Sequence, residues 1–390
     1  MASRKIVFLV PDISAQITTP AVHFATLLAE DFEVSVIGPD LGGGVSELHR
    51  DCPFLRPVPA SRIYRLPEFL AGTRRLCRRA DADAVVAFKA YLDTVLPALW
   101  ARRGGGRALV YLDELDSAVL AGMSRTERAK LWCRQFHHPL DEVYFPLAER
   151  LLRHADRILC SSTALARRFG GEVVHFGVDT RRFAPPSPET TAALRGRAGL
   201  ARYRTIVFGG AVRPHKGVEL ILEAIRRLGR GDLRLVVVGP ETEQLRSLRA
   251  SPRYGPLLVF LGPRPRTEMP HYLDLADLIV LPLQDTCLAQ TQVPCKVFEA
   301  MAMAKPIVAT AVSDLPEILA GCGIVVPPAD PEALAGAIGR ILANPEEARR
   351  MGRAAREKCI REYSAGQTRR KLLAVLSGLG LDPERGVKDA

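Results

Sequence analysis

The segment FGGAVRPHKGVEL, residues 208–220, joins a short apolar run to the start of a helical pattern. Gly209 and Gly210 carry no Cβ, so their backbone amides can approach a bound anion, and the N-terminus of the following helix adds partial positive charge. Arg213 and Lys216 supply full charges. This pattern is compatible with a diphosphate cradle. A Gly-Gly turn between a strand and a helix is equally a common structural feature, and the spacing matches neither the dinucleotide nor the P-loop motif.

A second segment, TQVPCKVFEAMAMAKPIVAT at residues 291–310, is apolar apart from a few charges. Lys296 and Glu299 lie three residues apart, as in an ordinary helical ion pair that stabilises a helix by about 0.2–0.5 kcal/mol. The alternative is a ligand site. Only nine of the 54 basic residues are lysine, and Lys216, Lys296 and Lys305 fall in or beside these two segments. A compact ammonium suits a phosphate oxygen, although chance can also place three lysines together.

The elements that must position these residues follow a repeating pattern. Short apolar runs such as KIVFLV, DAVVAF and RALVYL alternate with helical stretches, and after a break at 184–203 the alternation resumes with TIVFGG, LRLVVVG and LIVLPL. This alternation predicts parallel sheets covered on both faces, in an α/β chain of two doubly wound domains. The predicted parts are an N-terminal domain at 1–185, a C-terminal domain at 203–370, and a C-terminal helix and tail at 371–390 that can return to the N-terminal domain.

Composition narrows the functional class. The eight cysteines form no C-x-x-C pair and have no histidine at ligand spacing, so neither a zinc site nor a disulfide framework is indicated. No run of about 18 apolar residues occurs, and the N-terminus turns polar too early for a signal peptide. We therefore expect a cytoplasmic protein. The net charge of +11 suits an acidic partner, but no nucleic-acid motif or aromatic-interleaved basic strand is present.

The positive charge is concentrated in the stretch PEFLAGTRRLCRRA. Arg74, Arg75, Arg78 and Arg79 share one face of the expected helix, opposite its apolar residues. Such a helix is most simply a solvated surface with its other face on the core. A basic amphipathic helix can also lie on anionic lipid, which would place the protein peripherally at the inner face of the membrane.

Five segments together carry a family resemblance. They look like successive blocks of the family-4 retaining glycosyltransferases of the GT-B fold, and they span roughly the second half of the chain. The blocks are HFGVDTRRFAPP (175–186), FGGAVRPHKGVELILEAI (208–225), RLVVVGP (234–240), VFLGPRPRTEMPHYLDLADLIVLP (259–282) and PCKVFEAMAMAKPIVATAVSDLPEIL (294–319).

This resemblance implies two Rossmann-like domains facing a central cleft, with a nucleotide-sugar donor in the second domain, an acceptor in the first, and no metal or other cofactor. It further implies that Glu299 holds the nucleotide ribose. Arg213 and Lys216 would neutralise the departing diphosphate as catalytic residues, aided by amides near Gly209 and Gly210. Lys296 would face the same donor site.

Two positions depart from the family pattern. Thr291 stands where the family has a glutamate assigned in many members to the donor sugar, so recognition of that sugar would depend on Thr291, Gln290 or Gln292. Ala211 stands where an arginine usually follows the glycines, and Arg213 can reach the same anion from the loop.

The N-terminal half offers candidates for acceptor binding. Lys89 ends the run DAVVAFKAY, and Asp113, Glu114 and Asp116 follow the run RALVYL. A carboxylate at the end of a parallel strand can orient an acceptor hydroxyl or a cationic acceptor, with Asp113 as the catalytic candidate; equally, it can cap the next helix. Lys89 can meet an acceptor phosphate or carboxylate, or be a solvated loop lysine.

The sequence therefore predicts an enzyme that moves a sugar, with retention of configuration, from a nucleoside diphosphate such as UDP or GDP to a hydroxyl on a small metabolite or a lipid-linked glycan. Two alternatives stay open because of Thr291. One is other nucleotide-sugar chemistry, such as epimerisation or a non-glycosidic coupling. The other is a catalytically silent scaffold that binds nucleotide.

Overall fold

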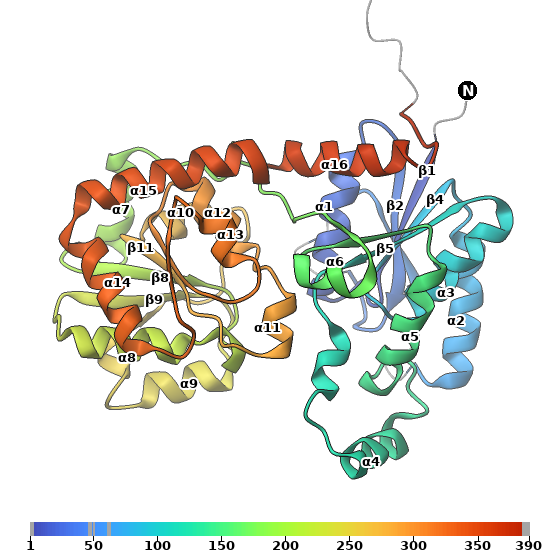
Figure 1. Cartoon of the computed structure of the whole chain (residues 1–390), viewed down its shortest axis with the longest axis horizontal. Helices are drawn as coiled ribbons and strands as arrows, with labels where there is room; N and C mark the ends of the chain where they lie inside the picture. Colours follow the sequence, from blue (N-terminus) through green and yellow to red (C-terminus); the bar gives the residue numbers. More distant parts are fainter. Residues whose placement is uncertain (1–3, 46–48, 50, 61–63, 384–390) are drawn as a thin grey trace, which may run out of the picture. The chain divides into compact units, whose positions relative to one another are not determined.

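The computed structural model describes residues 4–45, 49, 51–60 and 64–383, which fold into two compact units (Figure 1). Unit 1 comprises Met1–Phe176 and Thr368–Ala390, and unit 2 comprises Gly177–Gln367. The chain thus passes from one unit to the other at 176/177 and at 367/368. The sequence pattern placed these transitions later, within 184–203 and at residue 371.

Unit 1 is built on a parallel sheet of apolar strands. In its described residues the strand order is β3-β2-β1-β4-β5-β6-β7, and each neighbouring pair is parallel. All five residues of β4 are buried, because helices cover both faces of the sheet. The strands are β1 (Lys5–Leu9), β2 (Glu33–Asp40), β3 (Leu55–Pro59), β4 (Ala84–Phe88), β5 (Arg107–Leu112), β6 (Arg157–Cys160) and β7 (Glu172–Val173).

The helices of unit 1 connect these strands. Buried Phe69 and Leu76 attach α2 to the core, while its arginines Arg74, Arg75, Arg78 and Arg79 are exposed, as the amphipathic pattern predicted. The helices are α1 (Thr19–Leu28), α2 (Leu66–Arg79), α3 (Leu92–Ala101), α4 (Arg125–Gln135), α5 (Phe145–Leu151) and α6 (Thr163–Phe169).

Unit 2 repeats the arrangement with the described strand order β10-β9-β8-β11-β12-β13, again with parallel pairs. Buried apolar residues fill both faces of this sheet. The strands are β8 (Arg204–Gly209), β9 (Leu233–Val238), β10 (Leu258–Phe260), β11 (Leu278–Leu281), β12 (Ile307–Thr310) and β13 (Ile324–Val326).

The helices of unit 2 follow its strands in turn. α8 packs on the sheet through Val218, Ile221, Leu222 and Ile225, and α14 lies against it. The helices are α7 (Pro188–Arg197), α8 (Val218–Leu228), α9 (Glu243–Ala250), α10 (Met269–Asp274), α11 (Cys287–Thr291), α12 (Lys296–Ala302), α13 (Leu315–Leu319), α14 (Pro331–Ala343) and α15 (Pro345–Lys358).

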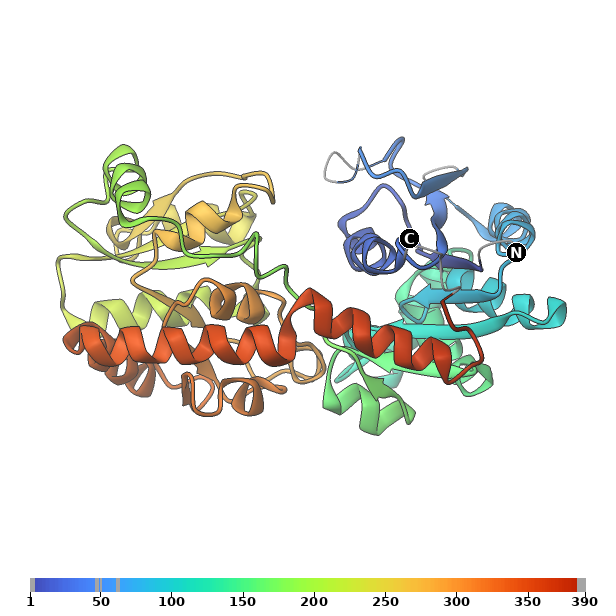
Figure 2. The same cartoon turned by 90° about the horizontal axis from the view of Figure 1, so that it is seen from above.

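The C-terminal stretch is helical almost throughout, as its sequence predicted. α15 passes through a π-helical turn at Cys359–Tyr363 into α16 (Ala365–Ser377), the red end of the chain in Figure 2. From Thr368 onward α16 belongs to unit 1, where the Thr368 hydroxyl donates to His175 O at 3.0 Å. None of the helices in the described part of the chain is long and apolar enough to cross a bilayer.

Each sheet has one place where the strand order reverses. In unit 2 it lies between β8 and β11, and in unit 1 between β1 and β4. Connections leave to opposite sides there, so a crevice opens beyond the carboxyl ends of the strands, and ligands of doubly wound sheets bind in it. Gly209 ends β8 and Lys89 directly follows β4, so two of the candidate sites stand at these positions.

Candidate functional site

The turn after β8 is a close meeting of backbones. Gly210 has φ +105° and donates its amide to Val238 O at 2.6 Å. A Cβ on the neighbouring Gly239 would lie 2.5 Å from Gly210 O. Only glycine adopts such a backbone without strain, and the amide of Gly210 itself is engaged by Val238. The sequence prediction for Gly209 and Gly210 thus has a structural counterpart in a tight turn at the switch point.

Lys296, from the first turn of α12, lies against this glycine turn. A Cβ on Gly210 would be 3.1 Å from Lys296 Nζ, and the ammonium lies 5.6 Å from the centroid of the Phe208 ring. Burial lowers the pKa of the Lys296 ammonium; Glu299 opposes this shift, and Arg266 and Arg213 add to it. Lys296 therefore belongs to a group of cations beside Gly210 and is more than a helical partner of Glu299.

Glu299, one turn further along α12, is half-buried. Its Oε1 lies 3.5 Å from Arg266 Nη2. Burial raises the pKa of the Glu299 carboxyl, and Arg266, Lys296 and Arg182 oppose that shift. Arg266 and Arg182 were not among the residues predicted from the sequence. Both lie within the blocks that carried the resemblance, but neither stands at a spacing that marks it.

Arg213 and Lys216 bracket a short 3₁₀ turn at Pro214–Lys216, just before α8. The Lys216 amide donates to Arg213 O at 2.9 Å, and Gln284, beyond β11, donates its amide to His215 O at 3.0 Å. The turn is thus fixed to the end of β11. It places two cationic residues at the N-terminus of an 11-residue helix, where the helix dipole also favours an anion.

Thr291 is buried at the end of α11. Its hydroxyl donates to Leu288 O at 2.9 Å, a carbonyl of the same helix. Gln290 is also engaged, since its amide group donates to Asp285 at 2.7 Å and its carbonyl oxygen accepts from Ser313 N at 3.0 Å. The role of Thr291 in recognising a donor sugar stays a prediction.

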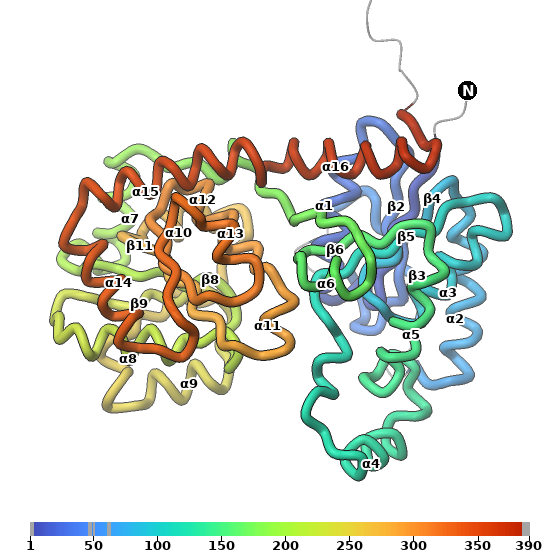
Figure 3. The backbone as a smooth tube through the Cα atoms, in the orientation of Figure 1, coloured from blue at the N-terminus to red at the C-terminus, as the bar shows by residue number. Residues whose placement is uncertain are grey.

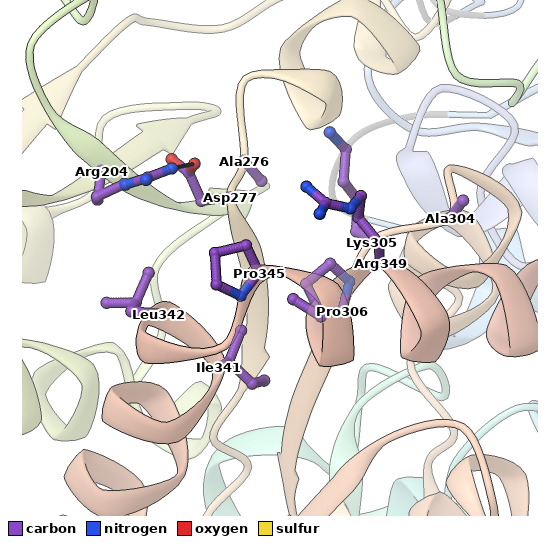
Figure 4. A pocket seen from close by; sticks show the side chains of 11 residues that line it. Arg204, Ala276, Asp277, Ala304, Lys305, Pro306, Ile341, Leu342, Pro345 and Arg349 are labelled. Carbon is purple, nitrogen blue, oxygen red and sulfur yellow. Dashed lines mark hydrogen bonds and ion pairs between the residues drawn. The ribbon is translucent and has the colours of Figure 1, made fainter.

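Lys305 does not join this group. It stands just before β12, at the amino ends of the strands, where its Nζ lies 2.8 Å from Asp274 Oδ1 and donates to Asp274 O at 2.8 Å. It lines a pocket of about 240 Å³ together with Arg349 and the ion pair of Arg204 with Asp277, 2.9 Å apart (Figure 4). The suggestion that Lys305 belongs with Lys216 and Lys296 is therefore wrong, because α12 carries the chain across the sheet.

In unit 1 the candidate acceptor residues form one cluster. Lys89 has φ +66° and is 5% exposed. Its Nζ lies 3.2 Å from Asp113 Oδ1, 2.5 Å from Glu114 Oε1 and 3.0 Å from Asp116 Oδ1. The ammonium is therefore enclosed by carboxylates, which differs from the solvated or phosphate-binding lysine considered from the sequence.

Carboxyl groups outnumber cations in this cluster. Burial alone would lower the pKa of Lys89, but the three carboxylates outweigh it and raise that pKa well above its ordinary value. Burial raises the pKa of Asp113, and that of Asp116 to about 7, although Lys89 opposes both shifts. One ammonium facing three carboxyl groups leaves a site that favours hydroxyl donors or a cation over an anion.

No group of three or more His, Cys, Asp and Glu side chains in the described residues is placed to hold a metal ion. The site in unit 2 consists of a glycine turn, cations and a carboxylate, and the site in unit 1 consists of Lys89 with three carboxyl groups around it.

Two family models match the chain, one in each unit. The model described as "Glycosyl transferases group 1" matches residues 203–344, and that described as "Glycosyl transferase 4-like domain" matches residues 19–176. The chain belongs to the family-4 retaining glycosyltransferases. This glycosyltransferase transfers a sugar from a nucleotide-sugar donor to an acceptor, as the sequence predicted.

Curated relatives and solved structures extend the comparison. The glycosyltransferase is 29% identical over 330 residues to the GDP-mannose-dependent alpha-(1-6)-phosphatidylinositol monomannoside mannosyltransferase of Mycolicibacterium smegmatis, covering 82% of this chain and 83% of that protein. It is 28% identical over 229 residues to the D-inositol 3-phosphate glycosyltransferase of Streptomyces bingchenggensis, which covers 52% of this chain and 49% of that protein.

The fold of the glycosyltransferase is shared with the Anabaena protein HepE, whose crystal structure contains UDP. The TM-score is 0.75 at 18% sequence identity, with 96% of this chain and 100% of that chain covered. This likeness confirms the predicted GT-B fold of two Rossmann-like domains. The roles of the individual site residues stay predictions.

Proposed function

We propose that the donor diphosphate binds at the Gly209–Gly210 turn of unit 2. The observation that carries the proposal is the position of Lys296 against Gly210, within electrostatic reach of Arg213 and Arg266. Several cations beside a turn that carries no side chains favour a strongly anionic group. Side chains then neutralise the diphosphate without a metal, so transfer is expected to persist in the presence of a chelator.

Glu299 is proposed to accept hydrogen bonds from the ribose hydroxyls of the donor nucleotide. Its half-buried carboxylate lies near Arg266 and Lys296, whose charges favour the ionised form. A carboxylate with two oxygens suits a vicinal diol, and its position one turn beyond Lys296 separates ribose from diphosphate along α12.

In the reaction, the bond between the anomeric carbon and the diphosphate oxygen breaks, and its electron pair remains on the diphosphate. Lys216 and Arg213 stabilise this growing charge, which makes them catalytic residues. The acceptor oxygen attacks from the same face and its proton passes to the departing diphosphate. No nucleophile of the enzyme is needed for this step.

The acceptor is proposed to bind at the cluster of Lys89, Asp113 and Asp116 in unit 1. Asp113 orients the acceptor by accepting a hydrogen bond from its hydroxyl group. Asp116 and Lys89 hold Asp113 in place. The excess of carboxyl groups over cations supports an acceptor rich in hydroxyl groups, such as a polyol or a glycan.

The donor is proposed to be GDP-mannose or a UDP-sugar, since the relatives named above include a GDP-mannose-dependent enzyme and a structure with UDP. Thr291, in place of the family's glutamate, is the position at which sugar preference would differ. A thermal-shift panel of GDP-mannose, UDP-glucose, ADP-glucose and dTDP-glucose tests this, because a ligand that binds only the folded state raises its apparent stability.

The protein is further proposed to be cytoplasmic and to contact the inner face of the membrane peripherally through Arg74, Arg75, Arg78 and Arg79. All four side chains are exposed on α2, which supports contact with anionic lipid. Co-sedimentation with anionic vesicles that is insensitive to charge reversal at these arginines would contradict this contact.

The site assignment is tested by two substitutions. Lys216→Ala is expected to lower kcat by about 10²–10³, the usual loss when one transition-state charge partner is removed. Glu299→Ala is expected to weaken nucleotide binding by roughly tenfold to a hundredfold, as for a lost charge-assisted hydrogen bond. Steady-state kinetics and nucleotide titration measure these effects.

The matched control is Glu243→Ala, an exposed glutamate in the first turn of α9, which should leave both quantities unchanged. Unchanged donor kinetics in Lys216→Ala and Glu299→Ala, with the fold intact, would refute the donor site.

A further inference from the structure

Helix α4 has no buried residue, so it lacks the packing of an apolar face on a core that stabilises most helices in proteins. Figure 3 traces the chain out from β5 to α4 and back to α5. A capping box of Ser124 and Glu127 starts the helix, and Gln135 donates to Glu142 at 2.5 Å. An 11-residue helix is marginal in water without an apolar face on a core. The ring of Trp132 packs on Tyr144 with ring centroids 5.5 Å apart, but half of Trp132 stays exposed.

The apolar side chains of α4 are exposed on one face. Trp132 and Phe136 lie one turn apart, and each is 50% exposed. The chain then reaches α2, since Leu66 donates its amide to His137 O at 2.9 Å. Leu66 and Leu70 on α2 are 42% and 54% exposed. We call Trp132, Phe136, Leu66 and Leu70 the apolar rim.

The two helices that carry the apolar rim are strongly basic. α4 and its cap carry one acid, Glu127, against four cations, and α2 adds four exposed arginines against Glu68. Aromatic side chains with a basic border match an anionic lipid surface, where rings occupy the headgroup level and cations meet lipid phosphates. The cations are Arg125, Arg128, Lys130 and Arg134 on α4, and Arg74, Arg75, Arg78 and Arg79 on α2.

We propose that the apolar rim inserts into the headgroup region of an anionic bilayer, with Trp132 as its anchor. This goes beyond a contact of the α2 arginines alone, which would be electrostatic and would leave α4 in water. It rests on the proposed acceptor site in one respect: the segment that leads into α4 begins at Asp116, so insertion would bring that cluster to the lipid surface. The acceptor class is then a lipid with a polyhydroxylated headgroup.

A second copy of the chain fits the rim less well. Two copies meeting through this face would bring eight cations of one against eight of the other, and like charges at an interface cost free energy. An anionic bilayer instead complements them, and it accepts four separate apolar side chains without requiring a shaped groove.

The two tryptophans of the chain allow a direct test. Trp132 lies in the rim and is 50% exposed, whereas Trp100 ends α3 and is 51% exposed, with Arg103 stacked at 4.2 Å. In Trp100→Phe, Trp132 is the only tryptophan fluorophore. Vesicles of phosphatidylglycerol and phosphatidylcholine should shift its emission to the blue and make it quenchable by brominated lipid, but pure phosphatidylcholine vesicles should not.

Trp132→Phe is the matched control, because Trp100 then reports from outside the rim. Its emission should not change with vesicles. Reversing two charges of α4, Arg125→Glu with Arg128→Glu, should weaken partitioning about fivefold or more for each cation removed. Leu70→Ser with Phe136→Ser should abolish the blue shift while the exposed arginines still give weak co-sedimentation.

Three outcomes would overturn the proposal. The first is vesicle binding without a shift of Trp132, which leaves the α2 arginines as the contact. The second is a shift that appears without lipid as protein concentration rises, which indicates a second copy. The third is no binding at all. Hydrolysis of the donor in detergent-free solution is measured alongside, and its persistence in every rim variant separates failure of insertion from failure of the donor site.

Discussion

At the scale of single residues, Asp93 is a fully buried carboxyl group of unit 1 that no cation among the described residues compensates. It lies in the first turn of α3 with 0% exposure, and no other residue of the described structure donates a hydrogen bond to its carboxylate oxygens. Burial raises the pKa of Asp93 well above its ordinary value, and Asp12 adds to that shift. At a pH between the unfolded and the folded pKa, the folded chain therefore holds a proton on Asp93 that the unfolded chain releases.

The pH dependence follows from this difference. An unfolded aspartate ionises at about pH 4. The free energy of unfolding therefore falls as the pH rises above that value, and it stops falling once the folded carboxyl has also ionised. Asp93→Asn removes the titrating proton at nearly constant shape. Denaturant unfolding should show the variant more stable than wild type by about 1–3 kcal/mol at pH 8, with the difference shrinking toward pH 4.

Asp81→Asn, an exposed aspartate just before β4, is the control and should give a difference near zero at both pH values. A gain for Asp93→Asn that is as large at pH 4 as at pH 8 would contradict ionisation as its cause.

The residues of the donor site were predictable from sequence to different degrees. The glycine turn and Glu299 could be placed together because carboxyl ends of parallel strands share one edge. Arg266 could not, since its loop has no periodic pattern that fixes where a side chain points. The grouping of Lys305 with the donor-site lysines was wrong, because α12 separates Lys305 from Glu299 in space although the two residues are close in sequence. The ion pairs of Lys89 could not be predicted either, because the three carboxyl groups come from the loop after the next strand, β5.

At the scale of elements, α8 starts closer to β11 than a side chain allows. A Cβ on Gly217 would lie 1.9 Å from Pro282 O, just beyond the end of β11. Gly217 has φ +63°, and so does Gly229 at the other end of the same helix, where a Cβ would meet nothing within 4 Å. The two glycines thus share a backbone conformation and differ in the space around them.

Gly217→Ala should therefore be far more damaging than Gly229→Ala. The second variant is expected to lose about 1–2 kcal/mol, the cost of a left-handed backbone for an L side chain. The first adds a clash with a backbone carbonyl that forces α8 away from β11, and with it Lys216. Urea unfolding and kcat measure both effects, and equal losses in the two variants would show that close packing at β11 does not fix the site.

The elements themselves were largely predictable. Strands buried on both faces read as continuous apolar runs, and these runs marked β1, β4, β5, β8 and β9. α4 was not anticipated, because a helix with no buried residue has no periodic apolar face to reveal it. Its capping box of Ser124 and Glu127 was the available signal.

At the scale of the whole molecule, the C-terminal chain contributes to the stability of both units, because it leaves unit 2 and ends in unit 1. α16 enters unit 1 at Thr368, and Leu372, Val375 and Leu376 are buried there. Arg369 donates to Leu27 O at 3.1 Å and lies 2.5 Å from Asp31 Oδ2. The carbonyl of Leu27 is in the last turn of α1, where it lacks a partner within the helix.

Arg369→Ala should weaken unit 1 and leave the donor site unaffected. The side chain is 32% exposed, so solvent screens part of its ion pair and the expected loss is roughly 1 kcal/mol. Amide hydrogen exchange should quicken in α1, while α8 in unit 2 keeps its protection. Affinity for UDP or GDP should stay constant, because Lys216, Lys296 and Glu299 all belong to unit 2.

Arg370→Ala is the matched control, since Arg370 is the next residue of the same helix and is exposed. It should change neither the exchange of α1 nor nucleotide affinity. Faster exchange in α1 and α8 together would mean that the units unfold as one cooperative body. A fall in nucleotide affinity with α8 still protected would mean that the donor site depends on unit 1. Only loss confined to α1 and its neighbours supports two units of separable stability.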